Sequence, residues 1–346
     1  MEIIYLSDGY RGGNSTFIEQ NINFNLKNKK KVILIDKKPN LTFPQLRRHK
    51  NLKIIKLDVI KEKIKVKKFI TNLGHNNYLF FFTNFAILIY YFFYFYNRKK
   101  NYKLAMALHS GVFNYKLKTF LGLFVFSFFS LSLDYLIYGS FSSKNWWLRF
   151  FPWMRLINYK VILNGIDLNK KKIKKKSITN ISFIGRLERE NDPDLFLDIC
   201  FLNKKNKKIK FNIFGDGSLK NVINKRINNI KIWGWADKKI IYANTDITII
   251  TSPINNFPYV ALESNSYGIP VITAAQGDVR RIIKNNYNGY IFDLRTKESY
   301  NKHLMNTLKN YKRLSKNYFI NSKKFSSQKS CHQICRFLKI MNNNIT

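Results

Sequence analysis

The sequence predicts an α/β chain of two Rossmann-like domains that face each other across a cleft. A length of 346 residues exceeds what one hydrophobic core usually organises. From Asn180 onward, short β-branched runs alternate with helical patterns, which is typical of parallel α/β sheets. A lysine-rich stretch over 169–176 separates two halves. We therefore expect an N-terminal domain over 1–168 and a C-terminal domain over 169–317, with a helix within 318–346 that returns to the first.

The elements of the second half justify this prediction in order. Asp192 and Pro193 offer an N-cap and a first-turn proline for a helix after the first strand. A helix that starts near Pro258 ends at Gly268, before Pro270. The expected strands are Ile181–Ile184, Lys210–Phe214, Ile230–Trp233, Asp246–Thr251 and Val271–Thr273.

The first half repeats the alternation less regularly. A strand over Ile3–Leu6 leads through Gly12 and Gly13 to a helix, which a capping-box pattern at Thr16–Glu19 is expected to open. The further strands that we expect are Val32–Ile35, Leu104–Leu108, Tyr135–Tyr138 and Val161–Leu163.

The uncharged aromatic run Tyr78–Tyr96 has two interpretations. Its length is close to the ~20 residues that cross a bilayer, so it could anchor an integral membrane protein. A buried strand over Tyr78–Thr83, a turn at Asn84 and a helix ending near Asn97 explain its polar interruption without a membrane, and we favour this interpretation.

The net charge of the chain limits the classes of partner that it can bind. Lys and Arg number 61 against 20 Asp and Glu, for a formal charge of +41. Such a charge attracts nucleic acids and anionic membranes. Because the lysines are scattered over separate segments, we expect no specific nucleic-acid partner, whereas an anionic membrane surface fits. A nucleic-acid-binding module would instead need a coherent basic stripe.

Three cysteines in so long a chain fit a reducing compartment. Cys331 and Cys335 lack a second pair of ligands, and the residues Asp192–Asp194 open a helix, so neither predicts a metal site. The N-terminus shows no secretion signal. We expect a cytoplasmic location.

Four loops follow strands of the second half, where open α/β sheets bind ligands. A diphosphate among them would meet one guanidinium, close-approaching glycine turns and a helix N-terminus. The loops are 185–186, 215–217, 233–235 and 255–258.

The C-terminal half of the sequence, with these loops and the motifs given below, resembles glycosyltransferase family 4, a retaining family of the GT-B fold. The resemblance covers about residues 160–295 and is poor within the N-terminal domain. The matching motifs are 164–167 (NGID), 183–187 (FIGRL), 214–217 (FGDG), 257–263 (FPYVALE), 267–272 (YGIPVI) and 288–292 (NGYIF), with Gly12 and Gly13 matching an N-terminal glycine loop.

The resemblance implies roles for individual residues. Glu263 would bind the ribose hydroxyls, Arg186 the donor diphosphate, and Trp233 and Trp235 would lie where the family holds the base. Glu263 and Arg186 also have plain structural interpretations, as an ordinary helix carboxylate and a surface arginine. The donor-binding residues so implied are Gly12, Gly13, Arg186, Gly215, Asp216, Gly217, Trp233, Trp235, Phe257, Pro258, Tyr259, Val260 and Glu263.

The catalytic residues implied are His109, Arg186 and Asn255. His109 would hydrogen-bond the sugar or developing charge; the alternative is an ordinary structural histidine. Two positions depart from the family: Asn255 replaces a usual glutamate, and Asn191 aligns with a usual lysine. Asn255 can still hydrogen-bond a sugar hydroxyl but carries no charge.

The function implied is transfer of a sugar from a nucleotide-diphosphate donor to a glycan or lipid-linked hydroxyl in cell-surface polysaccharide or lipopolysaccharide synthesis. No metal and no other cofactor are expected, and the enzyme would work at the cytoplasmic face of the inner membrane as a peripheral protein. The alternative is a nucleotide-sugar-binding partner subunit with weak or no activity. Donor base, sugar, acceptor and oligomeric state are not specified by the sequence.

Overall fold

The computed structural model describes residues 1–9, 13–44, 46, 49–73, 77–94, 102–109, 117–167, 180–224, 230–253 and 256–340. The chain divides into two compact units. Unit 1 comprises 1–165 together with 327–346, and unit 2 comprises 166–326.

Unit 1 contains a seven-stranded parallel sheet of order β3-β2-β1-β4-β5-β6-β7. Ile3 of β1 pairs with Val32 on one side and Leu79 on the other. The central strands are buried on both faces, which explains their continuous apolar sequences. The strands are β1 (Glu2–Leu6), β2 (Val32–Asp36), β3 (Leu52–Lys56), β4 (Tyr78–Phe82), β5 (Tyr102–Leu108), β6 (Tyr135–Tyr138) and β7 (Tyr159–Val161).

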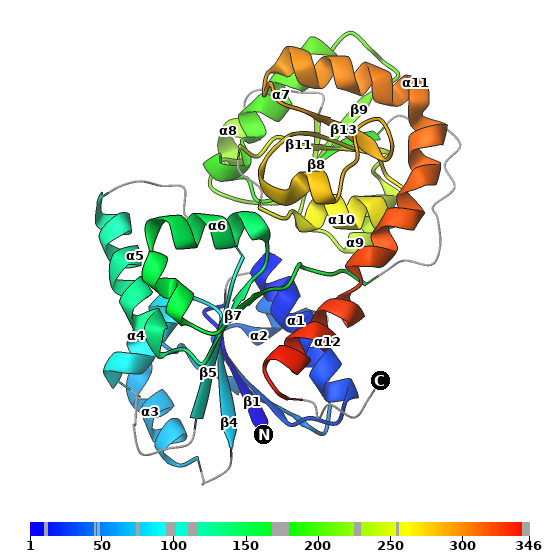
Figure 1. Cartoon of the computed structure of the whole chain (residues 1–346). Helices are drawn as coiled ribbons and strands as arrows, with labels where there is room; N and C mark the ends of the chain where they lie inside the picture. The colour runs from blue at the N-terminus through cyan, green and yellow to red at the C-terminus, as the bar shows by residue number, and fades with distance from the viewer. Residues whose placement is uncertain are drawn as a thin grey trace. The chain divides into compact units, whose positions relative to one another are not determined.

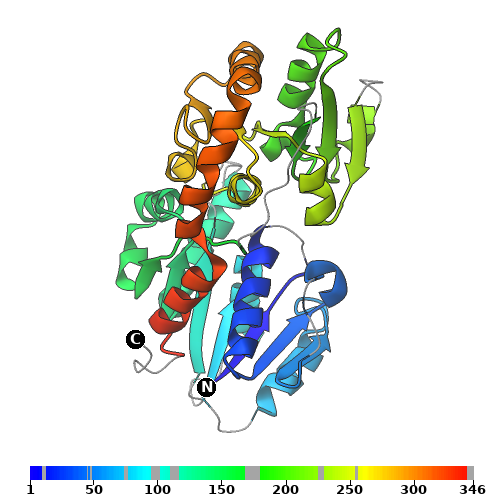
Figure 2. The same cartoon turned by 90° about the vertical axis from the view of Figure 1, so that its right-hand side faces the viewer.

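Helices cover both faces of this sheet. Residues of α3, α4, α5 and α6 join the strands in one large core (Figure 1). On the opposite face α1 and α12 lie side by side (Figure 2), although about 300 residues separate them. The helices are α1 (Gly13–Lys27), α2 (Pro39–Thr42), α3 (Lys63–Thr71), α4 (Phe85–Tyr94), α5 (Leu117–Phe129), α6 (Phe141–Phe150), α12 (Ser327–Phe337) and the 3-10 segments η1 (Ser130–Ser132) and η2 (Pro152–Leu156).

Unit 2 contains a six-stranded parallel sheet of order β10-β9-β8-β11-β12-β13. α7 and α11 pack on one face, and α9 with α10 lies toward the other (Figure 1). Its strands are β8 (Asn180–Ile184), β9 (Lys210–Phe214), β10 (Ile230–Gly234), β11 (Ile247–Ile250), β12 (Val271–Ala274) and β13 (Gly289–Phe292). Its helices are α7 (Pro193–Leu202), α8 (Lys220–Asn224), α9 (Lys238–Ala243), α10 (Tyr259–Ser266), α11 (Lys297–Ser322) and the 3-10 segments η3 (Arg189–Asn191), η4 (Gly277–Arg281) and η5 (Lys323–Phe325).

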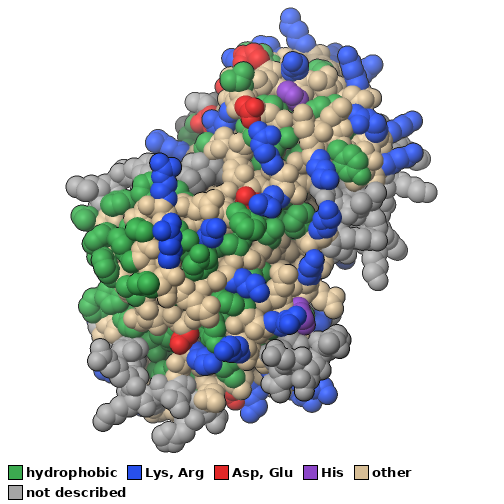
Figure 3. All heavy atoms as spheres, viewed as in Figure 1, with side chains coloured by type: hydrophobic (Ala, Val, Ile, Leu, Met, Phe, Trp, Pro, Cys, Tyr) green, Lys and Arg blue, Asp and Glu red, His purple; other side chains and the backbone are tan. Residues whose placement is uncertain are grey.

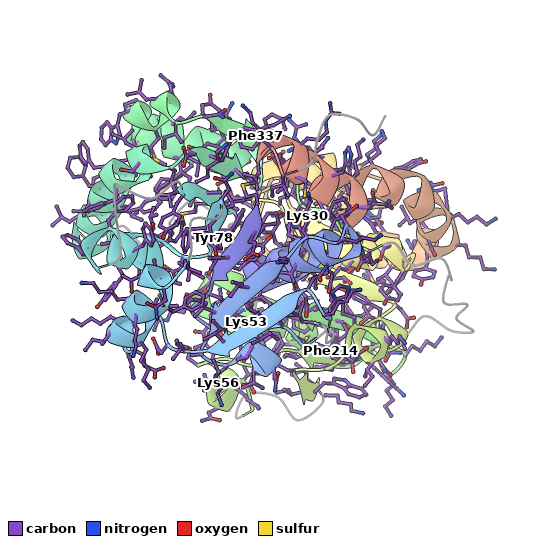
Figure 4. All side chains as sticks on the ribbon, turned by 90° about the horizontal axis from the view of Figure 1, so that it is seen from below. Lys30, Lys53, Lys56, Tyr78, Phe214 and Phe337 are labelled. Carbon is purple, nitrogen blue, oxygen red and sulfur yellow. The ribbon has the colours of Figure 1, made fainter. Side chains whose placement is uncertain are left out.

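The edge strand β3 of unit 1 carries Lys53 and Lys56 (Figure 4). Lysines on an edge strand oppose pairing with the edge of another sheet. Lys53 Nζ lies 5.9 Å from the centroid of the Phe69 ring, so its aliphatic stem also covers apolar surface.

The aromatic run near residue 80 forms β4, a turn at Thr83 and Asn84, and α4, so the interpretation as strand and helix is confirmed. No helix among the described residues is both long and apolar enough to cross a membrane. The part of the run beyond Tyr94 lies outside the described residues.

One expectation about a helix is wrong, and another holds over a shorter range. The capping box does not open α1, because the helix begins at Gly13 and buries Glu19, while the Asn14 side chain anchors its first turn to the Thr83 carbonyl at 2.6 Å. The helix expected within 318–346 is α12, which covers Ser327–Phe337 and belongs to unit 1, whereas residues 318–322 belong to α11. Between them Phe325 accepts a hydrogen bond from the Ile166 amide, which takes its carbonyl out of a helix.

Candidate functional site

The candidate site of unit 2 lies at the carboxyl ends of β8 and β11. These strands are neighbours, yet the chain leaves β8 toward β9 and leaves β11 toward β12, on opposite sides. Such a reversal of strand order leaves an opening between the two following loops, which is where open α/β sheets bind ligands. The loops concerned are 185–192 and 251–258.

Hydrogen bonds join these two loops. The Asn191 carboxamide donates to the Arg186 carbonyl at 2.8 Å, and its oxygen lies 3.2 Å from Ser252 Oγ. Ser252 Oγ is also 2.9 Å from the Glu190 carbonyl, and the Thr251 hydroxyl donates to the Asp192 carbonyl at 2.8 Å. Asn191 thus connects the loops as a neutral bridge, at the position where the sequence resemblance led us to expect a lysine.

The Arg186 guanidinium is half exposed at this opening. Its Nη2 donates to Glu190 Oε1 at 2.7 Å. An exposed pair of this kind contributes about 0–1 kcal/mol, so an anionic ligand can compete for the guanidinium.

Asp192 closes the loop after β8. It adopts a left-handed backbone conformation (φ 46°, ψ 63°) and accepts a hydrogen bond from the Leu195 amide as the N-cap of α7, as predicted. Arg295, which sequence reasoning missed, forms an ion pair with the Asp192 carboxylate and donates from Nε to the Thr251 carbonyl at 2.9 Å. Nothing in the local pattern around Arg295 distinguishes it from a surface residue.

The glycines after β9 are required by packing between loops. Gly215 has φ +147°, and a Cβ there would collide with the Gly185 carbonyl. A Cβ on Gly217 would lie 2.5 Å from the Leu187 carbonyl oxygen. Asp216 between them points to solvent, where Lys220 and the Gly217 amide lower the pKa of its carboxyl group. These contacts give a structural reason for the motif besides ligand binding.

Glu263 lies within α10 and is held at two points. Lys238 Nζ of α9 forms an ion pair with Glu263 Oε1 at 2.7 Å, and Tyr242 Oη donates to Oε2 at 2.8 Å. Burial, and secondly the charge of Glu263, raise the pKa of Tyr242 well above its usual value, which keeps the phenol a donor. The Glu263 side chain is 14% exposed, and these two contacts use only part of the acceptor capacity of its carboxylate.

Lys238 and Tyr242 are functional candidates that sequence reasoning missed. Both lie on a short helix opened by Asp237, whose carboxylate accepts from the Lys239 amide. The only signal in the sequence is that Lys238 and Tyr242 are four residues apart, so that they lie on one face of a helix. The sequence does not show that this helix packs against the helix that carries Glu263.

The start of α10 carries the predicted segment Phe257–Val260. Phe257 is buried and its ring lies 5.5 Å from that of Phe325. Pro258 is the N-cap and supplies no side-chain acceptor, and the Ala261 amide donates to the Pro258 carbonyl at 3.2 Å. The Val260 amide lies in the first turn, where a helix offers no carbonyl of its own as a partner. Asn255 lies outside the described residues.

The two predicted base-binding tryptophans differ in environment. Trp233 stacks on Phe214 at 5.3 Å, donates from Nε1 to Asn212 at 3.0 Å, and carries Lys231 Nζ 3.6 Å from its ring centroid. It is therefore engaged with the sheet. Trp235, at 46% exposure, offers the more accessible ring.

His109 follows β5 in unit 1 and is enclosed. Its ring meets Phe17 edge-on at 4.4 Å, and a Cβ on Gly139 would collide with Nδ1. Neither ring nitrogen has a hydrogen-bond partner among the described residues, and the same holds for Asn164 Oδ1 beside it. Burial lowers the pKa of His109 to about 4, an effect that the neighbouring Asn164 carboxamide only partly offsets. The imidazole is neutral at physiological pH.

Unit 1 has its own strand-order reversal, between β1 and β4. Gly13 is the first residue of α1 there, and the Thr83 hydroxyl donates to the Leu6 carbonyl at 2.9 Å, which ties the two loops together. Gly12 lies outside the described residues. The structure thus groups Arg186 with the glycine loop, and Glu263 with Lys238 and Tyr242, in unit 2, while Gly13 and His109 belong to unit 1.

Within the described ranges, no group of three or more His, Cys, Asp or Glu side chains is arranged to hold a metal ion. Cys331 and Cys335 are buried and free in α12.

Comparisons with known proteins agree with this geometry. Residues 166–327 match the family model described as glycosyl transferases group 1, which is nearly the extent of unit 2. An uncharacterized 41.2 kDa protein in the cps region of Klebsiella pneumoniae is 28% identical over 38% of this chain and 40% of its own length. The Escherichia coli UDP-Gal:alpha-D-GlcNAc-diphosphoundecaprenol alpha-1,3-galactosyltransferase is 27% identical over 40% of this chain and 42% of its own length.

The match to these two curated relatives therefore spans about two fifths of their length. Among solved structures, Anabaena HepE in complex with UDP and glucose superposes with a TM-score of 0.77 at 16% identity, covering 99% of this chain and 100% of that one. The chain accordingly has the two-domain α/β architecture of the GT-B fold, and its residues 166–327 match the glycosyl transferases group 1.

Proposed function

We propose that this protein is a glycosyltransferase that moves a sugar from a nucleoside-diphosphate sugar to a hydroxyl of a glycan or lipid-linked acceptor, with retention of anomeric configuration. The observation that carries the proposal is the Glu263 carboxylate, oriented by Lys238 and Tyr242 with lone pairs left over. Two adjacent ribose hydroxyls are matching donors for one carboxylate.

The loops at the strand-order reversal support the diphosphate part of the proposal. Arg186 can exchange its exposed bond to Glu190 for phosphate oxygens, which a guanidinium binds in a bidentate manner. The first amides of α10 add partial positive charge. Together they would stabilise the negative charge that develops on the leaving diphosphate. We expect no metal and no further cofactor for this step.

His109 would contribute as a neutral hydrogen-bonding group. With a pKa near 4 it offers one N–H donor and one acceptor nitrogen at neutral pH, and no positive charge. This suits contact with a sugar hydroxyl and argues against a role as an acid at neutral pH.

The names of the relatives support a place in cell-surface polysaccharide synthesis. One relative lies in a cps region, and the other is named for a diphosphoundecaprenol-linked acceptor. We extend to this chain the proposal of a lipid-linked or glycan acceptor at the cytoplasmic face of a membrane.

The test is binding and turnover of UDP-, GDP- and ADP-sugars by the full chain. Wild type should bind one base class saturably, Glu263→Ala should lose about tenfold or more in affinity, and Glu298→Ala, an exposed helix carboxylate elsewhere in unit 2, should match wild type. Asn255→Glu probes the departure at that position. Binding without turnover would favour a partner-subunit role; no binding of any nucleotide sugar would refute the proposal.

A further inference from the structure

From Phe120 to Phe129, every residue of helix α5 except Gly122 and Ser127 is apolar. Leu123 and Phe126 are buried in the core of unit 1. On another side Leu121, Phe124, Val125 and Phe128 are 55%, 41%, 44% and 48% exposed. Their spacing of i, i+3, i+4 and i+7 places them on one stripe of the helix. A surface helix of a globular protein ordinarily presents polar residues on that side, so this stripe calls for an apolar environment.

Neighbouring segments extend the stripe into a patch. Trp153 of η2 stacks on Phe128 at 5.0 Å and meets Phe124 edge-on at 5.7 Å. Phe150 at the end of α6 and Leu156 at the end of η2 are exposed as well. Hydrophobic side chains gather over these elements in Figure 3. We call Leu121, Phe124, Val125, Phe128, Phe150 and Leu156 the apolar face.

The charged side chains that the structure describes near the apolar face are mostly basic. Residues 120–158, which contain most of α5 and all of α6 and η2, include three basic residues, Lys144, Arg149 and Arg155, and one acidic residue, Asp134. The Asp134 carboxylate accepts a hydrogen bond from the Leu104 amide at 2.7 Å. Arg149 and Arg155 are exposed immediately beside Phe150 and Leu156, and Lys144 lies on the same helix α6. An anionic surface with an apolar interior complements this arrangement.

We propose that the apolar face docks unit 1 onto an anionic lipid bilayer, with α5 parallel to the membrane plane. Because Leu123 and Phe126 are packed in the core, α5 can enter only as deep as its exposed stripe. Trp153, whose indole N–H donates to the buried Ser127 Oγ at 3.1 Å, adds the apolar face of its ring to this surface. A second copy of the chain is a poorer occupant, because it would bring one basic rim against another. This proposal stands on the surface alone and does not depend on the proposed transferase activity.

The test is flotation of the full chain with vesicles of phosphatidylcholine alone and with about one third phosphatidylglycerol. Wild type should float with the anionic vesicles, weakly with the neutral ones, and partly dissociate at about 0.5 M NaCl. The double variant Leu121→Asp with Val125→Asp should lose about tenfold or more in binding. The matched control is Ile64→Asp with Leu294→Asp, which changes two other exposed apolar residues by the same charge.

Circular dichroism melts verify that both variants fold. Equal flotation of the two double variants, or no flotation of wild type with anionic vesicles, would overturn the proposal. So would sedimentation showing a wild-type dimer that Leu121→Asp with Val125→Asp dissociates while neither protein binds vesicles, because the apolar face would then be an interface between copies.

Discussion

At the scale of single residues, the two contacts that fix the Glu263 carboxylate are the most informative feature. A carboxylate that is fixed by an ammonium and a phenol loses little entropy when it accepts further hydrogen bonds. Lys238 and Tyr242 therefore act as positioning residues for whatever donor Glu263 meets. On the proposed function, that donor is the ribose.

Lys238→Met is expected to weaken nucleotide-sugar binding by about tenfold, because Glu263 loses a charged partner and its orientation. Lys238→Arg should restore most of the affinity. Lys239→Met, one residue further on the same helix and exposed, is the control and should change little. The decisive measurement is the ratio of affinities for a ribonucleotide and its 2′-deoxy analogue, which should fall toward one in Lys238→Met. An unchanged ratio would mean that Lys238 does not position the ribose contact.

His109 makes stability depend on pH. Its pKa is about 4 in the folded chain and near 6.5 when unfolded. Between these pH values the unfolded chain binds more protons than the folded chain. The contribution of the neutral His109 to the free energy of unfolding is therefore fully present above pH 6.5 and is lost as the pH falls toward 4. The loss amounts to at most about 3 kcal/mol. Denaturation of wild type and His109→Gln across this range should give a steeper decline for wild type; parallel curves would contradict the burial of a neutral imidazole.

At the scale of elements, five of the six strands of unit 2 could be predicted, because strands that are buried on both faces have continuous β-branched sequences. Strand β13 was not among the expected strands. Strand β3 was not predicted, because Lys53 and Lys56 interrupt the apolar sequence of this short edge strand. The partners of Glu263 could not be predicted either. Lys238 and Tyr242 lie more than twenty residues earlier, and only the packing of α9 beside α10 makes them neighbours.

The same substitution should have opposite effects in two elements. Gly122 lies inside α5 with nothing within 4 Å of an added Cβ, so Gly122→Ala should stabilise the protein by about 0.5–1 kcal/mol through helix propensity. Gly215→Ala should destabilise by more than about 1 kcal/mol, because its Cβ meets the Gly185 backbone at φ +147°. Urea denaturation measures the change in the free energy of unfolding for each variant. If both variants were stabilised, or both destabilised, the explanation given for one of the two glycines would be wrong.

At the scale of the whole molecule, the chain crosses between its units twice, near residues 165 and 326. Helix α12 contributes to unit 1 although all of unit 2 precedes it. Ile334 and Cys335 are buried within unit 1, and Ser330 Oγ donates to the Leu163 carbonyl at 3.0 Å. Unit 1 is therefore complete only after α12 has been made.

This topology predicts which unit a C-terminal substitution weakens. Ile334→Ala removes a buried side chain from α12 and should lower protection of unit 1 strands against hydrogen exchange by about 2–5 kcal/mol. Leu304→Ala is the matched change in α11, only thirty residues earlier, and should affect unit 2 strands instead. Hydrogen exchange read by mass spectrometry separates β1 and β4 from β8 and β11. If Ile334→Ala weakened β8 and β11 as much as β1 and β4, the assignment of α12 to the stability of unit 1 would be wrong.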